Sequence, residues 1–138
     1  MRQPGWAAAA SGVALLVASC GSPPLHEVTG RVTLDGRPLE AALVTYISDD
    51  DRREFFLART DAEGRYRLQP DGSRAGALAG RYIVRVTTLQ EPDTRSDPPV
   101  PGIAERVPRR YNLKSELRAE VEPGVNERSF DLVTKEPR

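Results

Sequence analysis

Residues 28–39 constrain the fold more than any other stretch of this chain. Their side chains alternate between apolar and polar up to an Asp-Gly pair, which is the period of a β-strand with one buried and one wet face. The apolar set is Val28, Val32 and Leu34, and the polar set is Thr29, Arg31 and Thr33. Asp35 and Gly36 then supply the positive-φ positions that a short hairpin turn needs. The stretch predicts a strand, a tight turn and the entry to a second strand.

Turn-forming residues are spread through the rest of the chain. The sequence has 12 Pro and 11 Gly in 138 residues, which favours many short strands over a helical bundle. With 38% hydrophobic and 6% aromatic residues, the chain can bury one modest core. We therefore expect a single all-β domain.

The residue inventory narrows the classes of function. The chain has 20 Lys and Arg against 20 Asp and Glu, one Cys and one His. A balanced charge lacks the basic field that nucleic-acid phosphates require, so we expect no nucleic-acid partner. A single Cys gives no disulfide framework, and a single His leaves most metal and nucleophilic sites without their parts. We therefore expect no metal and no cofactor.

The N-terminus has the pattern of an export signal. Arg2 forms a small positive region, residues 7–18 form an apolar run, and Ser19 and Cys20 follow. The run is shorter than the roughly 20 residues of a spanning helix, and it has signal-peptide flanks. We expect residues 1–19 to be a signal peptide that is removed.

Residues 17–20, Val-Ala-Ser-Cys, resemble the bacterial lipobox, in which the cysteine is lipidated and becomes the first mature residue. The resemblance implies a membrane anchor at Cys20, since two or more acyl chains, at about 0.8 kcal/mol per buried CH₂, hold a protein stably on a bilayer. Residues 20–26 then form a short tether stiffened by two prolines. No Asp follows Cys20, which by the same resemblance directs the protein to the outer membrane in a cell that has one. The alternative is an ordinary secretory signal followed by a free thiol.

Six further strands are predicted downstream, at residues 41–48, 55–60, 65–68, 80–86, 117–121 and 130–132. Strand 41–48 is partly apolar on both faces, which predicts a central position in a sheet. Asp61 and Gly64 are expected to close a hairpin turn before the strand at 65–68, Asp61 by accepting backbone N–H bonds and Gly64 by taking the left-handed conformation. The expected core is Val32, Val44, Tyr66, Val84, Val86, Leu117 and Phe130.

Residues 88–110 contain five prolines and show no periodicity. A connection of this length is uncommon in a compact domain, so we expect either a functional loop or a disordered excursion. The folded domain is expected to span residues 27–134, with residues 135–138 as a frayed tail.

Several motifs resemble the carboxypeptidase regulatory-like domain of the transthyretin-like superfamily. They are Val-Thr-Gly-Arg-Val at 28–32, Asp-Gly-Arg-Pro-Leu at 35–39, Thr-Asp-Ala-Glu-Gly-Arg-Tyr at 60–66 and Gly-Arg-Tyr-Ile-Val at 80–84. Residues 107–111, 124–126 and 130–132 are similar to the C-terminal half of small bacterial lipoproteins that carry this domain. The resemblance implies a seven-stranded Ig-like or prealbumin-like β-sandwich with a non-catalytic accessory or interaction role.

The residues that two catalytic branches of that superfamily require are missing from this sequence. Intradiol dioxygenases hold iron with two Tyr and two His, whereas this chain has only His26, which we expect to be a solvated tether residue. Hydroxyisourate hydrolases use several His and a Tyr-Arg-Gly-Ser ending, whereas this chain ends Thr-Lys-Glu-Pro-Arg.

The strongest candidate binding residues are Arg106, Arg109, Arg110 and Tyr111. Cations beside an aromatic ring at the end of a Pro-rich loop suit recognition of carboxylates or phosphates. The alternative is a solvated loop end balanced by Glu105 and Glu116, which is the more common outcome for surface charges.

Other candidates have structural alternatives that we favour. Residues 49–51, three Asp in a row, could supply calcium ligands but lack the spacing of a calcium loop, so we expect a solvated turn. Asp61 and Glu63 could form an acid and base pair, yet their place in a tight turn favours turn stabilisation. Tyr46, Tyr66 and Tyr82 share strand parity with Val and Leu, which favours packing over a stacking platform for glycans.

These observations lead to one main hypothesis and two alternatives. The main hypothesis is a non-catalytic, lipid-anchored module of the cell envelope that holds residues 89–110 toward a protein partner. A carbohydrate-binding module for cell-surface glycans is the alternative. A hydrolase is the weakest, because no pair of nucleophile and base can be named.

Overall fold

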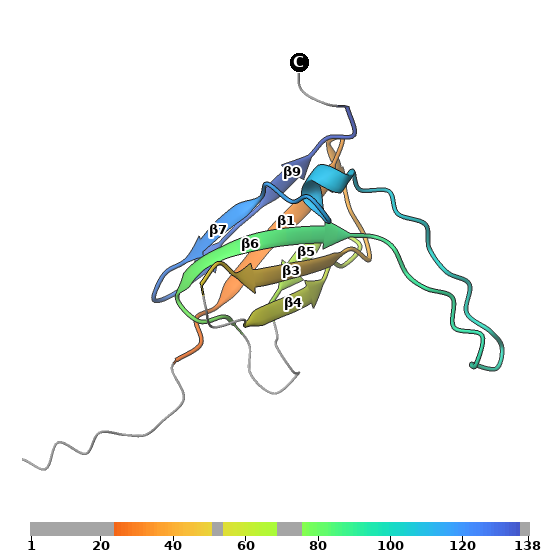
Figure 1. The fold of residues 1–138 in the computed structure, drawn as a ribbon, viewed down its shortest axis with the longest axis horizontal. Coiled ribbons are helices and arrows are strands. Elements are labelled where there is room, and N and C mark those ends of the chain that lie inside the picture. The colour runs from red at the N-terminus through yellow and green to blue at the C-terminus, as the bar shows by residue number, and fades with distance from the viewer. Residues whose placement is uncertain (1–23, 51–53, 69–75, 136–138) are drawn as a thin grey trace, which may run out of the picture.

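The computed structural model describes residues 24–50, 54–68 and 76–135. Within them, nine strands form two packed sheets, and one short 3-10 turn, η1 (Arg109–Tyr111), lies between β6 and β7 in the chain. Figure 1 shows the two layers, with an extended segment leaving them on the right. The all-β sandwich predicted from the sequence is confirmed. The predicted signal peptide and Cys20 lie outside the described residues.

The first sheet is built around β1 (Val28–Leu34). This strand pairs antiparallel with β2 (Arg37–Pro38) and β5 (Arg65–Arg67), and parallel with β8 (Asn126–Glu127) and β9 (Phe130–Leu132). The two-residue strands β2 and β8 add to the seven strands expected. The sheet therefore joins the beginning of the domain to its end.

The turn between β1 and β2 is the predicted hairpin. Asp35 and Gly36 both have positive φ, 51° and 79°, as a two-residue turn matched to strand twist requires. The Asp35 carboxylate also accepts hydrogen bonds from Thr134, at 2.9 Å from the backbone N–H and 2.7 Å from the hydroxyl. These bonds, the backbone one foremost, lower the pKa of Asp35. The turn thus also fixes the chain beyond β9.

The second sheet has the order β4-β3-β6-β7 and is antiparallel throughout. Its strands are β3 (Leu43–Ser48), β4 (Phe55–Arg59), β6 (Gly80–Thr87) and β7 (Arg118–Val121). β3 is central, as its two partly apolar faces predicted. Of Asp49, Asp50 and Asp51, the last lies outside the described residues, while Asp50 accepts a hydrogen bond from the Ser48 hydroxyl at 2.6 Å.

The inward-facing side chains of both sheets form one core. Val32, Val44, Tyr66, Val84 and Val86, all predicted to be core residues, are buried. Leu117 and Phe130 are half-buried and pack against the margin of this core instead. Phe130 belongs to β9 and Leu117 directly precedes β7, and each of these strands pairs with a single neighbour, so one flank of the residue lacks a covering strand.

Three tyrosines pack together in the core, and the bond between Tyr46 of β3 and Tyr66 of β5 connects the two sheets. The Tyr66 hydroxyl donates to the Arg128 carbonyl at 2.5 Å, so the Tyr46 hydroxyl is the donor in its 2.8 Å bond to Tyr66. The Tyr82 hydroxyl donates to the Leu78 carbonyl at 2.6 Å. Burial raises the pKa of Tyr46 to about 12 and raises that of Tyr66 as well. The prediction that these tyrosines pack in the core is confirmed.

Gly30 lets the chain cross close to β1. A Cβ at this position would lie 1.8 Å from the Arg128 carbonyl oxygen and 2.8 Å from the Tyr66 ring. Only glycine leaves room for that backbone. The strand pattern of residues 28–34 gave no sign of this contact, because Arg128 is about a hundred residues away along the chain.

The turn before β5 has the predicted local chemistry but a different role. Asp61 accepts the N–H groups of Glu63 and Arg65 at 3.0 and 2.9 Å, and Gly64 has a φ of 75°. However, the strands on either side belong to opposite sheets, so the expected hairpin is wrong. The turn instead carries the chain from one layer of the sandwich to the other.

The start of the domain also differs from expectation. His26 pairs with Ala77 through two backbone hydrogen bonds of 2.8 and 2.9 Å, and its Nδ1 accepts the N–H of Gly124 at 3.2 Å. Leu25 packs against the core. His26 is therefore part of the sandwich, and the expectation of a solvated tether residue is wrong.

Candidate interaction surface

An extended arm, residues 88–107, leaves the end of β6 and returns to η1. Two antiparallel bridges hold its halves together, Gln90 with Ile103 and Asp93 with Val100. Each bridge has two backbone hydrogen bonds of 2.9 Å. In Figure 1 the arm is the green-to-cyan segment that projects from the sandwich. The segment expected to be a functional loop or a disordered excursion is thus a paired arm.

Glu105 fastens the root of the arm. One carboxylate oxygen accepts the backbone N–H groups of Thr88 and Val107 at 2.9 and 3.0 Å, and also the Thr88 hydroxyl at 3.0 Å. The other oxygen accepts the Thr87 hydroxyl. Burial works to raise the pKa of Glu105, but these hydrogen bonds together lower it. The root is therefore held by an ionised carboxylate.

The tip of the arm is closed by a second carboxylate. Asp93 accepts the Ser96 hydroxyl at 2.5 Å and the backbone N–H of Arg95 at 3.0 Å. The hydroxyl bond is the main cause that lowers the pKa of Asp93. Between root and tip, Val100 and Ile103 are exposed by 54% and 40%. The arm thus presents apolar side chains to solvent on a locally ordered backbone.

A groove lies beside the root of the arm, on the outer face of the four-stranded sheet. It encloses about 450 Å³ and its wall is mostly apolar. Its lining residues are Thr45, Ile47, Arg85, Thr87, Leu89, Glu105, Arg109, Asn112 and Leu113. Leu113 and Leu89 are 72% and 53% exposed. The groove and the arm meet at Leu89 and Glu105, so they form one continuous surface.

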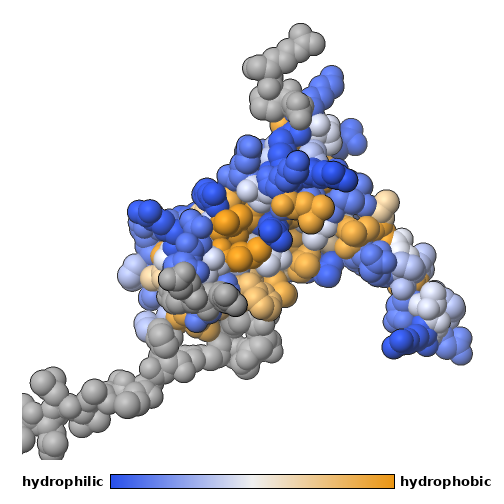
Figure 2. Space-filling view, viewed as in Figure 1, coloured by the Kyte–Doolittle hydropathy of each residue, from blue (hydrophilic) through white to orange (hydrophobic). Residues whose placement is uncertain are grey.

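The sheet face around the groove is also apolar. Ile83, Ile47 and Phe55 are direct neighbours across β6, β3 and β4. Figure 2, viewed from the same side, shows hydrophobic residues gathered over these strands. The outer face of a two-layer sandwich is normally polar, so this apolar patch is a candidate interaction site. The two apolar faces of strand 41–48 were the sequence signal for it, although they predicted only a central position.

The four predicted site residues have different surroundings. Arg109 lines the groove. Arg106 is exposed, and its backbone N–H donates to the Thr88 hydroxyl at 2.7 Å. Arg110 lies 4.7 Å from the centre of the Tyr111 ring and donates to the carbonyls of Val133 and Lys135. Arg109 therefore lies in the groove and Arg106 on the arm, whereas Arg110 and Tyr111 contact the C-terminal segment.

Arg110 and Tyr111 serve the end of β9. The Tyr111 hydroxyl accepts the Val133 N–H at 3.2 Å, beside the two carbonyls held by Arg110. The cation over the ring adds to this contact. The pair thus holds the C-terminal segment against η1.

No family model matches this chain, and a search of curated proteins found no match. Among solved structures, the chain is similar to a 9R-lipoxygenase from Cyanothece PCC8801, at 18% identity and a TM-score of 0.40. That likeness covers 79% of this chain and 16% of the lipoxygenase. At this TM-score it carries no argument about fold or function.

Two further findings concern the described part of the chain. There, no three His, Cys, Asp or Glu residues are grouped so that they could hold a metal ion. Nor does any helix in this part combine the length and apolar character needed to cross a bilayer.

Proposed function

We propose that this chain is a lipid-anchored module of the cell envelope that binds a protein partner through the arm and the adjoining groove. The observation that carries the proposal is the apolar outer face of the four-stranded sheet, continuous with a projecting arm. The lipid anchor rests on the lipobox-like residues 17–20. The resemblance to carboxypeptidase regulatory-like domains supports an accessory role of this kind.

The groove favours an extended protein segment with apolar and acidic side chains. Ile47, Leu89 and Leu113 provide apolar contacts, while Arg85 and Arg109 provide positive charge. Glu105, the carboxylate of the groove, already accepts four hydrogen bonds from the arm root. The groove has two arginines against one carboxylate, so its net charge is positive, which favours an acidic partner segment.

The alternatives have less support. The glycan hypothesis drew on tyrosines that could be exposed, and Tyr46, Tyr66 and Tyr82 are buried in the core. The hydrolase hypothesis drew on Asp61 and Glu63, and the Asp61 carboxylate is engaged in its own turn. Neither the tyrosines nor the turn at Asp61 and Glu63 offers the continuous apolar area that the arm and groove provide.

Site-specific photo-cross-linking in the cell envelope tests the proposal. A photoreactive residue replaces Leu113 in the groove, and a matched control replaces Val125, which is 78% exposed in the turn between β7 and β8. We expect the Leu113 probe to capture one defined acidic and apolar segment of another protein, and the Val125 probe not to. Arg109→Glu, or replacement of residues 90–103 by a short Gly-Ser link, is expected to abolish the capture.

Two outcomes would contradict the proposal. Equal capture by the Leu113 and Val125 probes would show nonspecific contact with neighbouring proteins and no specific binding site at the groove. If all the captured peptides came from this protein itself, the surface would bind a second copy of the chain and not a different protein.

The anchor is tested separately at Cys20. Cys20→Ala is expected to abolish metabolic labelling with a radioactive fatty acid and to prevent release from the signal peptide. Ser22→Ala is the matched control and should be labelled normally. Equal labelling of both variants would contradict the lipid anchor.

A further inference from the structure

The outer face of the other sheet carries a second, chemically opposite feature. A hollow of about 700 Å³ lies over β1 and β5 and beside the end of β4. Four arginines line it, Arg31, Arg59, Arg65 and Arg67, together with the carboxylates of Asp61 and Glu127. We refer to it as the arginine hollow. Its charge is positive by two.

The register of the sheet concentrates this charge. Arg31 of β1 lies directly opposite Arg65 of β5, and Arg67 is the next outward-facing residue along β5. Like charges directly opposite each other on paired strands are destabilising. The arrangement is expected where an anion between the strands offsets the repulsion.

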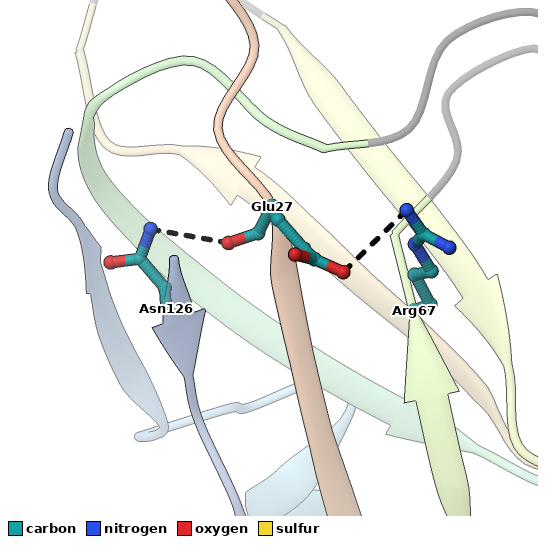
Figure 3. Close-up of polar contacts among 3 residues, drawn as sticks. All are labelled: Glu27, Arg67 and Asn126. Atoms are coloured by element: carbon teal, nitrogen blue, oxygen red, sulfur yellow. Dashed lines mark hydrogen bonds and ion pairs between the residues drawn. The ribbon is translucent and has the colours of Figure 1, made fainter. Parts of the chain in front are cut away.

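Most of the positive charge has no ionic partner. Arg67 pairs with Glu27 at 3.5 Å, and Figure 3 shows this contact together with the Asn126 amide that donates to the Glu27 carbonyl. Arg31 donates to the Glu63 carbonyl and Arg59 to the Ala41 carbonyl, both neutral acceptors. Among the described residues, no carboxylate oxygen lies within 4.0 Å of the Arg31 or Arg65 guanidinium. Two arginines at directly opposed positions of one hollow therefore have guanidinium groups without a carboxylate partner among the described residues.

Guanidinium groups in this arrangement suit phosphate. The planar fork of arginine donates two parallel hydrogen bonds to a phosphate, and two such forks match a phosphate group better than a single carboxylate. We propose that the arginine hollow binds a phosphate-bearing anion, and that the phosphate comes from the headgroups of the membrane to which the chain is tethered.

The position of the hollow favours the lipid source. β1 begins at Val28, eight residues after Cys20, and each residue spans at most about 3.6 Å. The start of β1 therefore stays within about 29 Å of a lipidated Cys20. A tether this short lets the start of β1 approach the membrane surface, where anionic headgroups attract basic groups within about one Debye length, roughly 8 to 10 Å. The choice of lipid phosphate rests on the proposed anchor, whereas the phosphate site itself does not.

Arginine footprinting on the intact lipidated protein tests the proposal. The protein is reconstituted in vesicles of phosphatidylcholine with or without phosphatidylglycerol, and arginines are labelled with phenylglyoxal. Arg31 and Arg65 are expected to react about threefold more slowly in the anionic vesicles, as occupancy at twice the dissociation constant gives. Arg37 and Arg95, exposed outside the hollow, should react equally in both.

A second arm separates the two phosphate sources. The detergent-solubilised protein is melted with and without inorganic phosphate, and binding should raise its Tm. Without phosphate, the Arg31→Gln/Arg65→Gln variant should have a Tm at least as high as that of the native protein, because the repulsion between the two opposed arginines is removed. It should lose the phosphate-dependent rise. The Arg37→Gln/Arg95→Gln variant has the same change in charge and should keep that rise.

Each outcome decides one step. Slower labelling in anionic vesicles supports the headgroup source. A phosphate effect on Tm without protection in vesicles would retain the site and overturn its lipid source. No effect in either arm would overturn the site. None of these readouts depends on the Leu113 cross-link, so the failure of this inference and that of the partner proposal are distinguishable.

Discussion

The sandwich and the arm are held by contacts of different kinds. The sandwich has a core of buried aliphatic side chains and a tyrosine network that joins its two sheets. The arm has four backbone hydrogen bonds in its two bridges, and one carboxylate at its root. Its apolar residues Val100 and Ile103 remain exposed.

This difference separates stability from binding. Segments with few buried apolar contacts open at low free energy, whereas a packed core opens only when the domain unfolds. Loops on a rigid scaffold are the usual place for binding residues. Substitutions in the arm are therefore expected to have little effect on the free energy of unfolding. Substitutions in the core of the sandwich are expected to lower it.

The largest effect is expected at Gly30. Gly30→Val places side-chain atoms where the Arg128 carbonyl and the Tyr66 ring now lie. Because backbone must move, we expect a loss of about 3 kcal/mol or more in the free energy of unfolding. Urea unfolding measures it. Gly36→Ala, where a Cβ meets nothing within 4 Å, is the control for backbone strain alone and should cost about 1 kcal/mol.

Gly64→Val is expected to come next, at about 2 to 3 kcal/mol. Its φ of 75° is unfavourable for a β-branched residue, and a Cβ would lie 2.4 Å from the Val32 carbonyl oxygen. Thermal unfolding followed by circular dichroism is the measurement. An unchanged Tm would show that the crossing between sheets does not depend on this turn.

Tyr66→Phe is expected to cost about 1 to 3 kcal/mol. The change removes the oxygen that accepts from the Tyr46 hydroxyl and the proton that the Arg128 carbonyl accepts, so a buried hydroxyl and a part-buried carbonyl each lose a partner. Phe56→Leu, a core change without a hydroxyl, is the comparison. If Tyr66→Phe were as stable as the native protein, the network would be packing alone.

Glu105→Gln is expected to have the smallest effect on global stability, within about 0.5 kcal/mol. Its effect is local: the amide protons of Gln90 and Ile103 should lose protection from hydrogen exchange. The folded pKa of Glu105 is lowered below its ordinary value of 4.5. The contribution of the ionised carboxylate is thus complete above that value and lost as pH falls through the lower folded pKa.

Nuclear magnetic resonance at decreasing pH measures this loosening. As the pH drops below the ordinary pKa of Glu105, we expect the amide protons of the arm to lose protection from hydrogen exchange, while those of the core keep it. The Glu105→Gln variant should lack this pH dependence. If the arm and the core lost hydrogen-exchange protection at the same pH, the arm would not open independently of the sandwich.

Local sequence patterns predicted the strands and turns well. The alternation in residues 28–34 and 80–86 and the Asp-Gly pair at 35–36 depend on the nearest neighbours, and each has the structure expected of it. The candidate site was predicted less well. Arg109 lines the groove, but Arg110 and Tyr111 hold the C-terminal segment, because their partners lie more than twenty residues further along the chain.

By itself, the sequence determined the all-β class, the inward face of each main strand and the positions that need positive φ, since these follow from side-chain period and backbone sterics. Only the tertiary structure decided that the turn at Gly64 links two sheets, that residues 88–107 pair with themselves, and that Arg31 meets Arg65. Each of these depends on which distant segments pair. Pairing is set by the burial of the whole core, and no window of neighbouring residues contains that information.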